Sequence, residues 1–174
     1  FIPRRVAVLA AEPLTTDQHS RFRASLERKL GWYGSTLIDL REVPLQTEPV
    51  AEALRAFLDA GAELILAGGG STIDPLDPVE LALARVGAHI VHRGGPTRGS
   101  MCWLARAGAV QFLNLASCAM WTGNTIGDLL LPLLHTARAV TQDDIREIGY
   151  GGLLGTEMAF RFPPYDRETD EPSR

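Results

Sequence analysis

The chain contains very little lysine and cysteine, and it has no excess of positive charge. Of its 17 basic residues only Lys29 is a lysine, a skew that we attribute to genome composition. The formal net charge of −4 at pH 7 provides no basic footprint for nucleic acid or for an anionic membrane. The two cysteines, Cys102 and Cys118, are too few for a disulfide framework and fit a reducing compartment, so we expect a cytoplasmic protein.

Long hydrophobic runs are also absent. No apolar stretch approaches the ~20 residues of a membrane span, and no signal-peptide pattern is present. Because the chain begins at Phe1 rather than at methionine, we expect it to be processed or truncated. A length of 174 residues with 45% hydrophobic content predicts a globular domain that can bury a core.

Apolar segments alternate with segments of helical periodicity along the sequence. Expected strands cover residues 5–11, 35–40, 63–67, 88–92, 101–104 and 110–115, and expected helices cover 16–30, 49–60, 78–86 and a segment from 124 or 125 onward. This alternation predicts an α/β fold whose sheet is covered by helices on both faces. The last two strands can pair as a hairpin around residues 106–108, so we expect a mixed, mostly parallel sheet.

The C-terminal region differs from the rest in composition. We predict that residues 1–140 form the α/β domain. A helix cap at residues 141–144 leads into a short helix, and from Thr156 onward charged residues and proline predominate. Residues 141–174 are therefore predicted to form a C-terminal helix and a polar tail that packs on the domain or frays from it.

The third expected strand ends in the loop Gly68-Gly69-Gly70-Ser71-Thr72. Ligands of open α/β sheets bind beyond the carboxyl ends of the strands, and glycines there let backbone N–H groups converge on an anion. A Walker loop would need lysine where Ser71 stands, and the dinucleotide fingerprint would need glycines in residues 10–13, which have none. The loop therefore predicts a phosphate or pyrophosphate site of another kind, with a plain tight turn as the alternative.

Two carboxylates, Asp74 and Asp77, follow the glycine loop. Carboxylates repel a neighbouring anion unless a cation lies between them, and magnesium commonly bridges carboxylate and phosphate oxygens. Asp77 can instead cap a helix that begins at Pro78, because proline suits the first helical position. We predict a magnesium site on Asp74 and Asp77, and helix capping by Asp77 remains the alternative.

Two further polar loops are expected at the same edge of the sheet, one at residues 94–101 and one from residue 115 onward. The residues in them that we assign to ligand binding are Arg98, Gly99, Ser100, Ser117, Cys118 and Asn124. Arg98 can reach an anion, and a Cys118 thiolate would suit a soft metal, although buried cysteine is usually inert. Three such loops at three strand ends predict one shared ligand site.

In this order, the three loops resemble the motifs of the molybdopterin-binding domain of molybdenum-cofactor biosynthesis. The motifs are Gly-Gly-Gly-Ser-Thr-Ile-Asp-Pro-Leu-Asp from residue 68, Gly-Gly-Pro-Thr-Arg-Gly-Ser from residue 94 and Leu-Ala-Ser-Cys-Ala from residue 115. The similarity spans about residues 4–136. It implies a three-layer α/β/α sandwich, assembly as a trimer or dimer, and a pterin that carries a phosphate as the ligand.

The resemblance also implies roles for individual residues. Gly68, Gly69 and Ser71 match the first glycine loop of the family, and Asp74 and Asp77 match its acidic positions, which are linked to magnesium and catalysis. Gly99 and Ser100 match the second loop, where biosynthetic members have Pro-Gly-Lys-Pro, and residues 115–119 replace a Leu-Pro-Gly-Asn-Pro turn. The absent lysine would have neutralised a transferring phosphoryl group.

These implications leave three functions open. The first is a molybdopterin adenylyltransferase or molybdenum insertase that uses magnesium and ATP, with Asp74 and Asp77 as catalytic residues. The second is a carrier or sensor module that binds molybdopterin without turnover, which the replaced turn favours. The third is an unrelated phosphate-sugar or nucleotide enzyme. We predict binding of molybdopterin or a related phosphorylated pterin, with no nucleic-acid or membrane partner, and leave catalysis open.

Overall fold

Strands and helices alternate along the chain in the computed structural model, which describes residues 1–70, 74–95, 100–115, 124–149 and 156–165. The strands are β1 (Arg5–Ala10), β2 (Thr36–Glu42), β3 (Leu64–Gly68), β4 (His89–Arg93), β5 (Trp103–Ala107) and β6 (Val110–Leu115). The helices are α1 (Thr16–Trp32), α2 (Thr47–Asp59), α3 (Pro78–Arg85), α5 (Ile126–Leu134) and α6 (Gln142–Ile148), followed by a short 3-10 helix at Thr156–Arg161. The predicted α/β fold is confirmed.

The strands form a six-stranded sheet in the order β2-β1-β3-β6-β5-β4. Strands β2, β1, β3 and β6 are parallel to one another, whereas β5 is antiparallel to both of its neighbours, β6 and β4. β4 therefore points in the same direction as the four parallel strands. The sheet is mixed and mostly parallel, as the sequence predicted.

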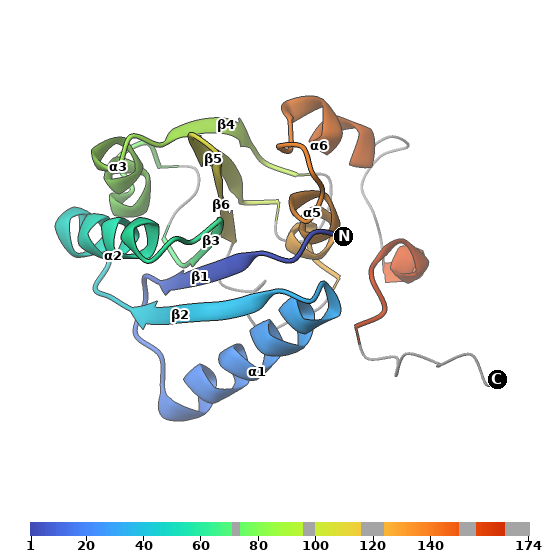
Figure 1. Ribbon diagram of the computed structural model, residues 1–174, viewed down its shortest axis with the longest axis horizontal. Coiled ribbons are helices and arrows are strands. Elements are labelled where there is room, and N and C mark those ends of the chain that lie inside the picture. The colour runs from blue at the N-terminus through green and yellow to red at the C-terminus, as the bar shows by residue number, and fades with distance from the viewer. Residues whose placement is uncertain (71–73, 96–99, 116–123, 150–155, 166–174) are drawn as a thin grey trace.

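Helices cover both faces of the sheet, with α2 and α3 on one side and α1 and α5 on the other (Figure 1). Alternate residues of a strand point to opposite faces. In β1, Val6 and Val8 pack in the core under α1 and α5, while Ala7 and Leu9 pack in the core under α2 and α3. The three-layer α/β/α architecture implied by the family resemblance is confirmed.

The hairpin between β5 and β6 is present, and Gly108 lies in its turn as expected, but the turn does not include Arg106 and Ala107. Both of these residues still pair with β6, and the chain reverses at Gly108, where φ is +57°. Glycine adopts this left-handed conformation without steric cost, so it marks the turn more reliably than the residues before it. The strand expected at residues 101–104 accordingly begins at Trp103 and continues to Ala107.

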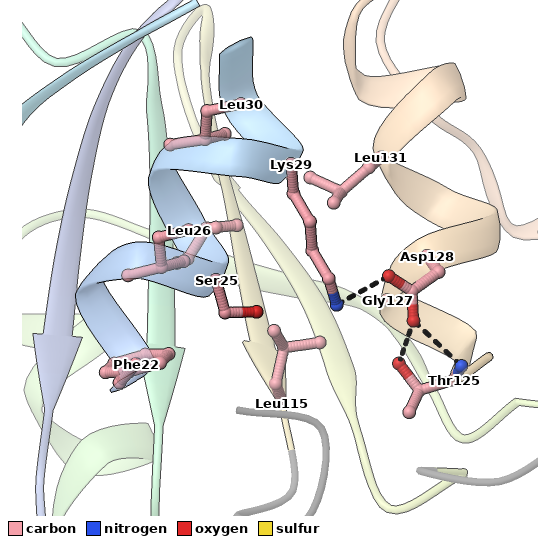
Figure 2. A pocket seen from close by; sticks show the side chains of 11 residues that line it. Phe22, Ser25, Leu26, Lys29, Leu30, Leu115, Thr125, Gly127, Asp128 and Leu131 are labelled. Atoms are coloured by element: carbon pink, nitrogen blue, oxygen red, sulfur yellow. Dashed lines mark hydrogen bonds and ion pairs between the residues drawn. The ribbon is translucent and has the colours of Figure 1, made fainter. Parts of the chain in front are cut away.

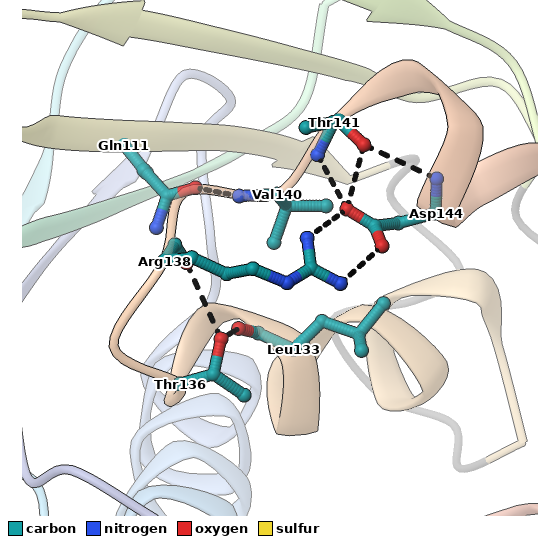
Figure 3. A network of polar contacts seen from close by, with 7 residues as sticks. All are labelled: Gln111, Leu133, Thr136, Arg138, Val140, Thr141 and Asp144. Atoms are coloured by element: carbon teal, nitrogen blue, oxygen red, sulfur yellow. Dashed lines mark hydrogen bonds and ion pairs between the residues drawn. The ribbon is translucent and has the colours of Figure 1, made fainter.

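A polar network orders the connection from α5 to α6 and the first turn of α6, and the N–H of Val140 links this connection to Gln111 of β6 (Figure 3). Arg138 donates two hydrogen bonds to Asp144 at 2.6 and 2.5 Å, and the Arg138 guanidinium holds the pKa of that carboxyl well below its usual range. The Asp144 carboxylate also accepts from the backbone and the hydroxyl of Thr141, which completes the capping box of α6. Ile145 then packs in the core under α1 and α5.

In the part of the chain that the structure describes, no helix combines the length and the apolar character needed to cross a membrane.

Candidate functional site

The loops after β3, β4 and β6 leave the sheet at one edge, because these three strands point in the same direction. β3 lies between β1 and β6, and the helices that follow these two strands, α1 and α5, cover the face opposite to α3. The connections on either side of β3 thus diverge to opposite faces. Such a topological switch point is where open α/β sheets bind their ligands, and the glycine loop begins there.

Gly69 and Gly70 turn the chain out of β3 with φ values of +89° and +77°. A Cβ on Gly69 would lie 3.2 Å from the backbone of Ala11, and a Cβ on Gly70 would lie 2.7 Å from Oδ2 of Asp77. Side chains are thus excluded at both positions by conformation and by space. The turn brings bare backbone beside a carboxylate at the switch point.

Asp77 caps α3 and is only 3% exposed. Its Oδ1 accepts a hydrogen bond from the backbone N–H of Val79 at 2.8 Å and a longer one from Glu80 at 3.4 Å. The capping alternative for Asp77 is therefore confirmed. Both carboxylate oxygens also lie close to Gly70, because a Cβ there would be 2.7 Å from Oδ2 and 3.0 Å from Oδ1, so the Asp77 carboxylate borders the glycine turn.

Asp74 begins the turn that leads into α3. Its Oδ1 accepts from the N–H of Leu76 at 2.9 Å, and its carbonyl accepts from the N–H of Asp77 at 3.0 Å. The side chain is exposed. Within the described ranges no three His, Cys, Asp or Glu side chains are grouped as metal ligands, so a magnesium ion here would need ligands from water or from a bound phosphate.

The other predicted site residues divide into two groups. Ser100 is exposed in the loop after β4, and Asn124 is exposed just before α5 with a φ of +60°, a conformation that asparagine tolerates. Ser71, Thr72, Arg98, Gly99, Ser117 and Cys118 lie outside the described residues. The described loop ends converge nonetheless, because a Cβ on Gly95 would lie 2.6 Å from the side chain of Ile126 at the start of α5.

Sequence reasoning missed an uncompensated amide at the carboxyl end of β6. Asn114 is fully buried and pairs across the sheet with Ala67 and Trp103. Neither polar atom of its side chain, nor the indole nitrogen of Trp103, has a hydrogen-bond partner in the described structure. Buried polar groups are nearly always satisfied, so these atoms mark a place for water or for a ligand atom beside the glycine turn. The signal was a polar residue, Asn114, at a buried position near the end of a strand that is mostly apolar.

A buried ion pair joins α1 to the start of α5 (Figure 2). Lys29 Nζ lies 2.7 Å from Oδ1 of Asp128, and Oδ2 of Asp128 accepts from the backbone and the hydroxyl of Thr125. The two charged side chains are 9% and 1% exposed. The pair borders a small, largely apolar cavity with Phe22 and Leu115. It connects the α1 layer to the end of the loop that follows β6.

The chain forms an α/β/α domain whose loops converge at one edge of the sheet, and comparison with known proteins identifies the fold more closely. No protein-family model matches the chain, and no curated protein matches it. It is similar to the solved structure of MogA, with 20% identity and a TM-score of 0.51 over 75% of this chain and 95% of that one.

Two further structures agree. The molybdopterin biosynthesis Mog protein from Mycobacterium ulcerans has 18% identity and a TM-score of 0.50 over 75% of this chain and 97% of that one. CinA from Thermoplasma acidophilum, a protein of unknown function, has 10% identity and a TM-score of 0.52 over 75% of this chain and 96% of that one. At such identities the likeness concerns the fold, and this chain has the fold of these proteins over nearly their whole length.

Proposed function

We propose that the protein binds molybdopterin, or a related phosphorylated pterin, at the carboxyl edge of its sheet, in molybdenum-cofactor biosynthesis or handling. The observation that carries this proposal is the glycine turn at the topological switch point. There Gly69 and Gly70 adopt conformations that exclude side chains, and the exposed Gly70 offers bare backbone that a phosphate can approach. The order of the three loop motifs and the molybdopterin biosynthesis protein of the same fold support the assignment of the ligand.

The acidic pair can assist because both carboxylates lie beside the glycine turn. Asp77 borders Gly70, and Asp74 begins the turn into α3 at the surface. Magnesium binds carboxylate, phosphate and water oxygens together, and would offset the repulsion between these carboxylates and a phosphate. In this proposal magnesium strengthens ligand binding. Nucleotidyl transfer would further need a cation near the phosphoryl group, and residues 94–101 lack the lysine of the biosynthetic members.

The first test is calorimetric titration with molybdopterin, with and without magnesium, followed by ATP in the same cell. Binding alone supports a carrier or sensor. Binding with release of AMP or pyrophosphate supports an enzyme of cofactor assembly. If molybdopterin does not bind under either condition, the proposal fails.

Replacing Asp74 by asparagine tests the role of its charge. Asparagine keeps the acceptor that closes the turn to Leu76, so only the carboxylate charge is lost. We expect the magnesium-dependent part of the affinity to fall about tenfold, the loss of one charge-assisted interaction. Asp59→Asn is the matched control, because Asp59 is exposed at the end of α2, before β3 begins at the opposite edge. Equal effects of the two substitutions would show that Asp74 has no special role.

A further inference from the structure

An open cavity of about 240 Å³ lies where the carboxyl end of β4 meets α6. One wall consists of His92, Arg93, Gly94 and Gly95, and the other consists of Ile145, Arg146 and Gly149. Helix α6 lies beside the end of β4 (Figure 1). Pockets for drug-sized ligands occupy about 300–1,000 Å³, so this cavity suits a small group and not a whole pterin nucleotide.

Basic side chains from both walls face this cavity. Arg146 comes from α6, where its side chain is 63% exposed and forms an ion pair with Asp143 at 3.0 Å. Arg93 comes from β4 and is paired with Glu80 of α3. Each guanidinium thus has one acidic neighbour, and Arg146, which is largely exposed, can offer further N–H donors to an anion, since a guanidinium carries five N–H groups.

His92 provides the third polar group and is the least satisfied of the three. Its Nδ1 is buried and has no hydrogen-bond partner within the described part of the chain. Burial lowers the pKa of His92 below 6.5, the Gly94 carbonyl opposes this shift, and the positive charge of Arg146 lowers the pKa further. The charged group that acts on the imidazole is thus a cation. Because its pKa is lowered, His92 is neutral at neutral pH beside the Arg146 guanidinium, and an anion bound between them would favour its protonation.

We propose that this cavity binds a phosphate-class anion, held between Arg146 of α6 and His92 of β4. An anion there would stabilise the protonated imidazole, and it would separate the imidazolium from the guanidinium. The site goes beyond the proposed pterin function and does not depend on it, because it uses α6 and the end of β4 rather than the glycine turn. Its occupant is either free phosphate or the phosphate group of a larger ligand that extends along the edge.

NMR titration of the histidine ring signals tests the proposal directly. Adding inorganic phosphate or pyrophosphate to the intact chain should raise the pKa of His92 by about one unit, the effect of an opposite charge within about 6 Å. The ring signal of His89, which is exposed on the same strand, serves as the internal reference and should not respond. If neither anion moves the His92 signal, and molybdopterin does not move it either, the proposal is wrong.

Arg146→Gln should weaken pyrophosphate binding about tenfold, the loss of one charge-assisted hydrogen bond. Arg146→Lys should retain part of the affinity. Arg21→Gln is the matched control, because Arg21 is also exposed on a helix and also pairs with an aspartate, Asp17, at 2.9 Å. Equal weakening by Arg21→Gln and Arg146→Gln would reduce the effect to net charge and overturn the assignment.

The ligand that shifts the His92 signal shows whether the site binds free phosphate or the phosphate group of a larger ligand. Inorganic phosphate alone would identify a site for the free anion, whereas a response confined to molybdopterin would identify the phosphate of the larger ligand. The two proposals also fail separately. If molybdopterin does not bind but phosphate still shifts the His92 signal, the pterin function falls and the anion site stands.

Discussion

Helices α3 and α5 follow neighbouring strands, and both begin with a buried carboxylate, but the two carboxylates are stabilised differently. Asp128 in α5 meets the ammonium of Lys29 from another helix. Asp77 at the start of α3 accepts from the backbone of its own helix, and its second oxygen faces the glycine turn. The charge at α5 is matched within the core, so its role is structural. The carboxylate at α3 borders the glycine turn, where we propose that the ligand binds.

The largest expected loss of stability comes from breaking the ion pair between Lys29 and Asp128 of α5. Lys29→Met leaves the buried Asp128 carboxylate without its cation and should lower the free energy of unfolding by about 3–5 kcal/mol, measured by urea denaturation. Arg23→Met is the control on the same helix, because Arg23 forms an exposed pair with Glu27 that should be worth at most about 0.5 kcal/mol.

A second substitution distinguishes loss of the ion pair from loss of packing. Adding Asp128→Leu to Lys29→Met removes the stranded charge as well and should restore part of the lost stability. If the double variant is less stable than Lys29→Met by the full cost of Asp128→Leu alone, the two side chains are not coupled, and the contrast between α3 and α5 disappears.

A smaller effect is expected at the start of α3. Alanine at Gly70 must adopt a φ of +77° and place its Cβ 2.7 Å from Asp77 Oδ2. Gly87→Ala shares the positive φ, at +71°, but its Cβ would have nothing within 4 Å. We expect about 1–2 kcal/mol of destabilisation at Gly87 from conformation alone and at least about 1 kcal/mol more at Gly70 from the overlap. Equal losses in denaturation would mean that Asp77 moves aside freely.

The smallest effect appears only on acidification and concerns the other end of α5. His135 is fully buried, and its Nδ1 is hydrogen-bonded to the carbonyl oxygen of Leu131 at 2.6 Å. Its ring stacks on Tyr33, with the ring centroids 4.2 Å apart. Burial lowers its pKa below the ordinary 6.5. The unfolded chain therefore binds a proton at a higher pH than the folded one, so stability is complete above about pH 6.5 and is lost as the pH falls towards the folded pKa.

Urea denaturation between pH 8 and pH 5 measures this loss. His135→Phe keeps the aromatic stack but cannot be protonated, so its stability should fall less steeply with acid than that of the unmodified chain. His92, whose pKa is also lowered, accounts for part of the remaining slope. Identical slopes for the two proteins would show that His135 does not contribute.

Local patterns were enough to predict most of the fold. The apolar periodicities located every strand and helix named in advance, and Asp77 and Thr141 were recognisable as caps because capping depends on residues three or four apart. The glycine loop was also predictable, because its glycines are adjacent in the sequence. The expected turn of the β5–β6 hairpin began two residues too early, at Arg106, because the sequence does not show that β5 extends to Ala107 and that the chain reverses only at Gly108.

Contacts between distant segments could not be predicted in this way. The pairing of Lys29 with Asp128 depends on how α1 and α5 pack on the same face of the sheet, and the lone lysine looked like an effect of composition. The importance of Asn114 depends on its pairing with Ala67 and Trp103, which the sequence alone does not show. The cavity at His92 and Arg146 requires β4 and α6 to meet.

The single lysine can also serve as a chemical probe of local opening. Lys29 carries its sole side-chain amine, and that amine is sequestered between α1 and α5. An acylating reagent can reach it only when these helices separate, so the rate of labelling at this one position reports the opening equilibrium of that layer under native conditions. Mass spectrometry of the intact chain would then measure local opening without any engineered probe. The terminal amine, which should be labelled fast, would serve as the internal standard for the labelling rate of Lys29.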